Sequence, residues 1–128
     1  MLSTVSLIAL AVIFAALVVA WTRRFLASGV LVAANVIVYV MTDFGPEVIA
    51  RVGGELVRES VVRLELSLWA GNLYNGEPIA ALQLLTSMFV HADFMHLLGN
   101  LIVLLAFALP FEERVGHRTF LGLYLAAG

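Results

Sequence analysis

Residues 86–109 decide the fold: they read TSMFVHADFMHLLGN and continue as LIVLLAFAL. The first part mixes polar and apolar residues, and the second part is apolar without interruption. As a helix, Phe94 to Phe111 would be roughly 27 Å long, close to the hydrocarbon thickness of a bilayer. The Asp93 carboxylate can accept hydrogen bonds from the free N–H groups of the first turn. We therefore predict a membrane-spanning helix that begins directly after Asp93.

His96 and Asn100 are the candidate functional residues of this helix. They are four residues apart and project from the same helix face. An imidazole and an amide at this depth must face protein or a water-filled cavity rather than lipid. Both groups can donate hydrogen bonds from fixed positions, as a developing oxyanion requires. The alternative is structural: Asn100 bonds a neighbouring helix and His96 caps local backbone.

The stretch resembles the second core helix of the rhomboid family of intramembrane serine proteases. The family patterns Thr-x-x-Phe-x-His, His-x-x-x-Asn and Glu-x-Arg-x-Gly are matched in order and spacing by Thr86, Phe89, His91, His96, Asn100, Glu112, Arg114 and Gly116. Tyr124 and Gly128 resemble the family's third helix, and Leu31–Val40 carries a weaker likeness. The resemblance implies an endopeptidase that cleaves transmembrane substrates, with His96 and Asn100 stabilising the oxyanion. Where the family often carries an arginine, this chain has Gln83, which can both donate and accept.

The composition indicates a membrane protein. The chain has 128 residues, enough for one domain, and is 62% hydrophobic and 12% charged, against roughly 45–50% and 25% in soluble domains. The fold class we predict is an all-α, polytopic helical membrane protein. The net charge is −2 and the seven basic residues are all arginines, which gives no basic patch for nucleic acid. The absence of cysteine excludes disulfides and a thiol nucleophile. We expect no cofactor.

Three further segments complete the predicted helices. Leu2–Trp21 is uncharged and long enough to span. A secretory signal peptide is the rival interpretation, but no positive charge precedes the run and the run is longer than usual. Phe25–Met41 resembles the first rhomboid core helix, which makes Leu2–Trp21 an additional helix. Its Asn35 is predicted to bond a neighbouring helix. Thr119–Gly128 reads as the start of another span.

The arginines predict the topology. Short loops rich in arginine favour the cytoplasm, so residues 22–24 and 112–118 are predicted to be inside and residues 42–93 outside. The predicted units are residues 1–24, the additional helix with its Arg-Arg turn, and residues 25–128, a rhomboid domain truncated in its third core helix. The partners expected are the lipid bilayer and transmembrane substrates or clients.

The loop from Thr42 to Leu85 is long and mixed in charge. Over Pro46–Leu68 its apolar positions are closer to the helical than to the strand period, with a break at Gly53-Gly54. We predict an amphipathic segment on the membrane surface. Asn75–Pro78 reads as a turn. Beyond the long helix, Glu112 is predicted to form an ion pair with Arg114 or a helix cap.

A serine protease also needs a nucleophile and a general base. Rhomboids take these from a Gly-x-Ser-Gly in the fourth core helix and a histidine in the sixth, and neither helix is in this sequence. Leu26–Gly29 is the nearest imitation, but it lacks the first glycine and is predicted to lie across the membrane from His96. Three functions therefore remain: part of a rhomboid protease, an inactive rhomboid-like protein that binds transmembrane clients, or a metal or haem protein using His91, Asp93 and His96. The last is disfavoured because zinc needs three or four convergent ligands.

Overall fold

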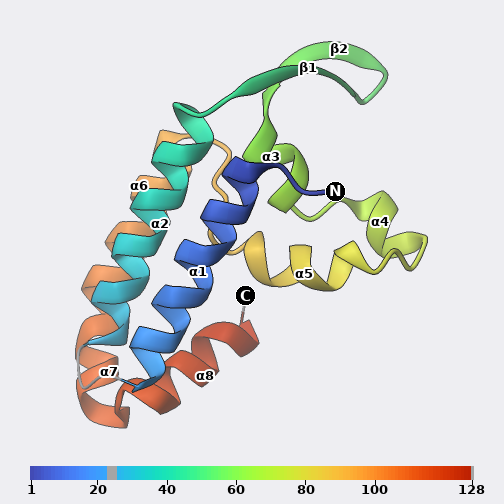
Figure 1. Cartoon of the computed structure of the whole chain (residues 1–128). Coiled ribbons are helices and arrows are strands. Elements are labelled where there is room, and N and C mark those ends of the chain that lie inside the picture. The colour runs from blue at the N-terminus through green and yellow to red at the C-terminus, as the bar shows by residue number, and fades with distance from the viewer. Residues whose placement is uncertain (23–25, 128) are drawn as a thin grey trace.

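A computed structural model describes residues 1–22 and 26–127 of the chain. Its elements are mostly helices, with one two-stranded hairpin (Figure 1). The predicted helical membrane-protein class is therefore confirmed, and the hairpin is an addition to it. Arg23 and Arg24, on which the prediction of a cytoplasmic first loop depends, lie outside the described residues, as do Phe25 and Gly128.

Two long helices form the centre of the fold. Helix α1 is Thr4–Thr22 and helix α2 is Ala27–Asp43, close to the predicted segments. They run antiparallel and side by side (Figure 1). Small residues occupy several of their buried positions, and small side chains let the backbones of membrane helices approach closely. These positions are Ser6, Ala9 and Ala20 on α1, and Ala27, Ser28 and Ala34 on α2.

A hairpin stands at one end of this pair, which we call the hairpin end. Strands β1 (Glu47–Val52) and β2 (Glu55–Ser60) pair antiparallel, with Val52 opposite Glu55. The two intervening residues, Gly53 and Gly54, both have positive φ. Two-residue hairpin turns of type I′ require this conformation, and glycine adopts it without strain. The helical prediction for this part of Pro46–Leu68 was therefore wrong, although the break at Gly53-Gly54 was correct.

Three short helices follow the hairpin. They are α3 (Val61–Leu66), α4 (Ala70–Tyr74) and α5 (Ile79–Thr86). The predicted turn between Asn75 and Pro78 separates α4 from α5, with Gly76 at φ 68°. Helix α3 buries Val62 and Leu66 against Ala9 of α1. The loop region is thereby fixed to α1.

The long helix that carries the candidate residues is built from three joined pieces. They are α6 (Phe94–Val103), the π-helix η1 (Leu104–Ala108) and α7 (Leu109–Val115). Pro110 has no N–H to donate and its ring clashes with the carbonyl four residues earlier. A wider π-turn directly before it relieves both problems. The helix therefore passes Pro110 and ends four residues beyond the predicted Phe111.

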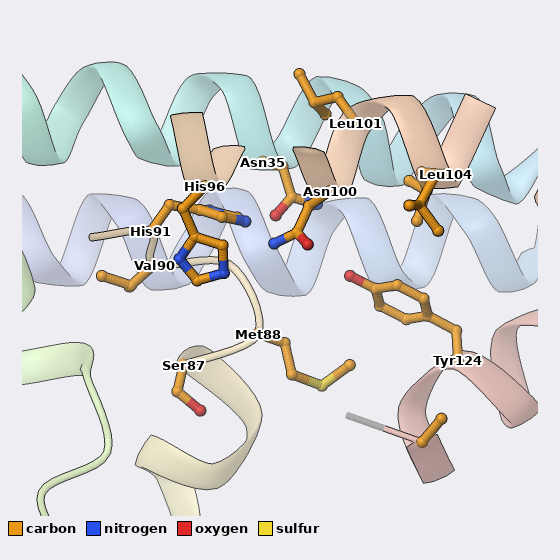
Figure 2. Close-up of a pocket in the computed structure, with 12 residues that line it drawn as sticks. Asn35, Ser87, Met88, Val90, His91, His96, Asn100, Leu101, Leu104 and Tyr124 are labelled. Carbon is orange, nitrogen blue, oxygen red and sulfur yellow. The ribbon is translucent and has the colours of Figure 1, made fainter. Parts of the chain in front are cut away.

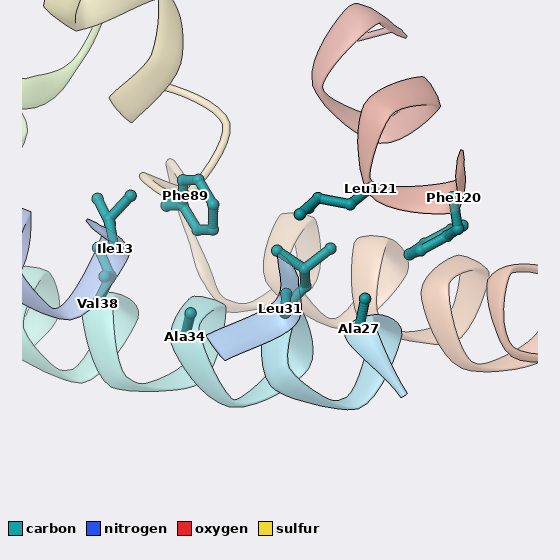
Figure 3. Packing of buried hydrophobic residues seen from close by; sticks show 9 residues of the cluster. Ile13, Ala27, Leu31, Ala34, Val38, Phe89, Phe120 and Leu121 are labelled. Atoms are coloured by element: carbon teal, nitrogen blue, oxygen red, sulfur yellow. The ribbon is translucent and has the colours of Figure 1, made fainter. Parts of the chain in front are cut away.

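Among the described residues, two helices are long and apolar enough to cross a membrane, namely Thr4–Thr22 and Phe94–Val115. Helix α2 is a shorter apolar helix of 17 residues. The last element, α8 (His117–Ala127), turns back beneath α1 and α2 at the α7 end, opposite the hairpin (Figure 1). Its Phe120 and Leu121 join the main apolar core, where α1 and α2 contribute most of the remaining side chains (Figure 3).

Candidate functional site

The start of α6 has the predicted cap. Asp93 is extended, with φ −155° and ψ 174°, and its Oδ1 accepts from the backbone N–H of His96 at 2.9 Å. This bond satisfies one of the free N–H groups of the first turn. It also fixes the residue from which the His96 side chain projects.

His96 and Asn100 both line one cavity, which has a volume of about 420 Å³. They project into it from successive turns of α6, as Figure 2 shows. Both residues are exposed, and no hydrogen bond of either side chain is found within residues 1–22 and 26–127. Their donors are therefore available to a group that enters the cavity.

Two polar residues from other helices share the cavity. Asn35 on α2 and Tyr124 on α8 both line it, and their polar ends point toward Asn100 (Figure 2). Asn35 was predicted to bond a neighbouring helix; its side chain interacts with Tyr124 of α8, and its Nδ2 also donates to Leu31 O of its own helix at 2.8 Å. Its place in the cavity was not predicted. The available signal was a buried polar residue in the middle of an apolar helix.

His91 lies next to His96 and contacts its ring. It is buried, and its Nδ1 lies 3.2 Å from the carbonyl oxygen of Phe89. Its ring meets that of His96 edge to face, with 5.2 Å between centroids. Burial lowers the pKa of His91 below its ordinary value, and the neighbouring His96 adds to this effect. The imidazole of His91 is therefore kept neutral at neutral pH.

Helix α5, directly before the loop that leads to the site, is held by side-chain bonds to α3 and α4. Gln83 donates to Glu65 O at 3.1 Å and accepts from Asn72 Nδ2 at 3.0 Å. Thr86 donates to Leu66 O at 2.7 Å. The glutamine at the position where rhomboids often have arginine thus anchors the loop through both its donor and its acceptor.

Glu112 lies at the α7 end and is buried. Its carboxylate accepts from the backbone N–H of Ala27, from the backbone N–H of Ser28 at 2.8 Å and from Ser28 Oγ at 2.7 Å. The helix-cap prediction was correct, and the helix that Glu112 caps is α2. The ion pair with Arg114 was wrong: the ion pair found within the described part of the chain joins Arg63 and Glu59.

The described residues offer neither a nucleophile beside a base nor a metal site. Ser28 bonds Glu112 at the opposite end from His96. Ser87 lines the cavity, but its hydroxyl donates to Leu84 O at 3.2 Å and points away from His96 (Figure 2). Residues 1–22 and 26–127 hold no group of three or more His, Cys, Asp or Glu side chains suited to a metal. The interpretation of His91, Asp93 and His96 as ligands therefore receives no support.

Comparison with known proteins gives one match. The family model of the Rhomboid domain matches residues 79–128. This segment contains α5, the long helix formed by α6, η1 and α7, which we call the site helix, and α8. No curated protein and no solved structure matches the chain. The domain match supports assignment of the chain to the rhomboid family, and together with the two apolar helices it identifies a membrane protein.

Proposed function

We propose that this rhomboid-family chain is part of an intramembrane serine endopeptidase and supplies His96 and Asn100 to the oxyanion site. The observation that carries the proposal is the cavity: both side chains face it, and neither is engaged within the described residues. The serine nucleophile and the histidine base would come from further helices of the same protein. The substrates would be transmembrane segments, because the site lies on a helix that can itself span the bilayer.

The proposed role of His96 and Asn100 depends on the negative charge that develops on the scissile carbonyl oxygen during the reaction. When a serine attacks the scissile carbonyl, the carbonyl oxygen becomes an oxyanion. A hydrogen bond from the Asn100 amide or the His96 imidazole is then stronger in the transition state than in the bound substrate. The edge contact with His91 and the Asp93 cap hold His96 in place beforehand. Such fixed donors act without reorganising when the charge forms.

Two substitutions test the role in the protein encoded by the complete reading frame. His96→Ala or Asn100→Ala should lower kcat by about 10²–10³-fold, the loss typical of one oxyanion donor. The melting temperature should change little, because both side chains are exposed to the cavity. Met95→Ala is the matched control, since Met95 is 70% exposed and does not line the cavity.

A structural role for the pair makes the opposite prediction. The variants would then melt at lower temperature, while the folded fraction kept its kcat. The 128-residue chain alone should release no product from a model transmembrane substrate, since oxyanion donors without a nucleophile cannot form the acyl-enzyme. Serine-dependent cleavage by this chain would contradict that prediction.

The second candidate function is an inactive rhomboid-like protein that binds transmembrane clients. It is favoured by the lack of a serine–histidine hydrogen bond among residues 1–22 and 26–127. The two candidates separate on one measurement. Client capture with no cleavage by the full-length protein supports the binding protein, whereas cleavage that depends on His96 supports the protease.

The proposed topology puts Arg23 and Arg114 in the cytoplasm and residues 42–93 outside. Because the chain contains no cysteine, single cysteines can be introduced without background labelling. An impermeant maleimide added to intact cells should label a cysteine that replaces the exposed Glu55 and should not label one that replaces Glu113. The reverse pattern would overturn the topology.

A further inference from the structure

Helix α3 contacts both the hairpin and the loop between α5 and α6 that precedes the site. Arg63 on α3 pairs with Glu59 of β2, with 2.8 Å between Nη1 and Oε1. The same Glu59 oxygen accepts from the backbone N–H of Ser60 at 2.9 Å. The carboxylate is thus held by two donors, and it orients one side of the Arg63 guanidinium.

The other side of the guanidinium contacts the loop between α5 and α6, which contains His91. Arg63 Nη2 donates to the backbone carbonyl of His91 at 3.4 Å. The residues on either side of this contact are also fixed: Val90 packs against the buried Val62 and Leu66 of α3, and Phe89 is fully buried in the main core. Arg63 therefore acts on a segment whose apolar side chains are already seated, and it sets the position of the His91 backbone.

His91 transmits this position to His96. The two rings meet at 72° with 5.2 Å between centroids, which is the favoured range for edge-to-face aromatic pairs. Because His96 makes no side-chain hydrogen bond within the described residues, the His91 ring is the group that limits its rotation on the loop side. A shift of the His91 backbone would turn the His96 donor away from the cavity.

Stability alone does not account for Arg63. Its Nε is buried without a partner in the described part of the chain, and a buried donor left unpaired costs free energy. From these contacts we infer that Arg63 is a positioning residue: it holds the His91 loop so that His91 keeps the His96 imidazole aimed into the cavity. The consequence for catalysis rests on the proposed function, whereas the consequence for the orientation of His96 does not.

The first experiment measures that orientation directly. In full-length protein with isotope-labelled histidine, Arg63→Gln should shift the imidazole NMR signals of His91 and His96 and leave that of His117 unchanged. Arg58→Gln removes an exposed arginine from the hairpin and should shift none of the three. Arg63→Lys keeps the charge without the two-sided geometry of the guanidinium and should resemble Arg63→Gln. Unchanged His91 and His96 signals in both Arg63 variants would overturn the inference.

The second experiment asks whether the orientation matters for the reaction. Arg63→Gln should lower kcat by about tenfold with little change in KM, as expected when a donor is misplaced. In a His96→Ala background the same substitution should cause no further loss, because its effect passes through His96. An undiminished loss in that background would refute the route. If the NMR shifts occur but His96→Ala keeps full activity, the proposed function fails while the positioning of His96 stands.

Glu65→Gln is the control for general damage to α3. Glu65 lies on the same short helix, but its carboxylate accepts from Ser3 N and Ser3 Oγ, both at 2.8 Å, at the start of α1. This variant should lower the melting temperature without changing the kcat of the folded protein. A loss of kcat equal to that of Arg63→Gln would show that any weakening of α3 suffices, and the specific role of Arg63 would be withdrawn.

Discussion

The two long apolar helices are embedded in the protein to very different extents. Of the apolar stretch of α1, 33% is buried within the protein, whereas for the helix Phe94–Val115 the share is 6%. The N-terminal helix α1 is thus the better covered one. The helix that carries the candidate site leaves most of its surface for lipid or for other helices.

The two helices are also held by different means. Helix α1 buries Ser6, Ala9, Ile13 and Ala20 along its length, so close packing holds it. On the site helix the buried side chains are Leu97 near one end and Glu112 near the other. The Glu112 carboxylate ties the α7 end of this helix to the start of α2, and the partly buried Leu104, Ala108 and Val115 pack against the core.

The largest expected effect tests that tie. Glu112→Ala leaves the N–H groups of Ala27 and Ser28 without their charged acceptor and should lower the free energy of unfolding by about 3 kcal/mol. Glu113→Ala is the matched control, because Glu113 is the exposed neighbour. Denaturant titration of both variants in detergent gives the comparison. Equal losses would show that the Glu112 cap does not hold the site helix.

The next effect tests the close packing of α1. Ile13 is fully buried in the main core, whereas Ile102 on the site helix is 56% exposed. Ile13→Ala should lower the free energy of unfolding by about 2 kcal/mol. The substitution leaves a cavity in the packed core, and lost packing is costly between membrane helices, which are held together mainly by close contact. Ile102→Ala should cost less than about 0.5 kcal/mol. The same denaturant titration measures both, and a larger loss at Ile102 would reverse the contrast between the helices.

The smallest effect is a pH dependence at the loop before the site helix. Burial lowers the pKa of His91 in the folded protein below the ordinary value of about 6.5. Below that value the unfolded chain therefore binds more protons than the folded chain, and stability falls as the pH falls. Above it the His91 contribution is constant. Melting temperatures between pH 7.5 and pH 5 should show this decline.

His91→Gln is the control for this prediction, because glutamine keeps polar groups at the position but does not titrate in this range. The variant should lose part of the decline below pH 6.5. An identical pH profile in both proteins would assign the decline to other groups.

Much of the fold could be predicted from local sequence. The Asp93 cap, the apolar runs and the turn at Asn75–Pro78 depend on residues close together in the chain, and the structure has all of them. The hairpin was missed because the apolar positions of residues 48–57 were read by period alone. Two consecutive glycines between segments that contain the β-branched residues Val48, Ile49, Val52 and Val57 were the stronger signal.

The contacts between distant segments could not be predicted in the same way. Glu112 was recognised as a cap or ion-pair residue, but its partner Ser28 is 84 positions away. The cavity is lined by α2, α6, η1, α8 and the loop before α6, so the approach of Asn35 and Tyr124 to Asn100 depends on how α2, α6 and α8 pack. His96 and Asn100 could be chosen from the sequence, because their spacing on an apolar helix is a local property of α6.

The π-turn at Leu104–Ala108 also changes the rotational phase of the site helix. In an unbroken α-helix, Asn100 and Glu112 would point about 120° apart, because each residue adds about 100°. A π-turn absorbs one extra residue, so their twelve-residue separation acts as eleven and the angle falls to about 20°. One helix face can then present an amide to the cavity and a carboxylate to the start of α2. Replacing Pro110 would favour a regular α-turn. Asn100 and Glu112 would then point in different directions, so that they could not reach the cavity and the start of α2 at the same time.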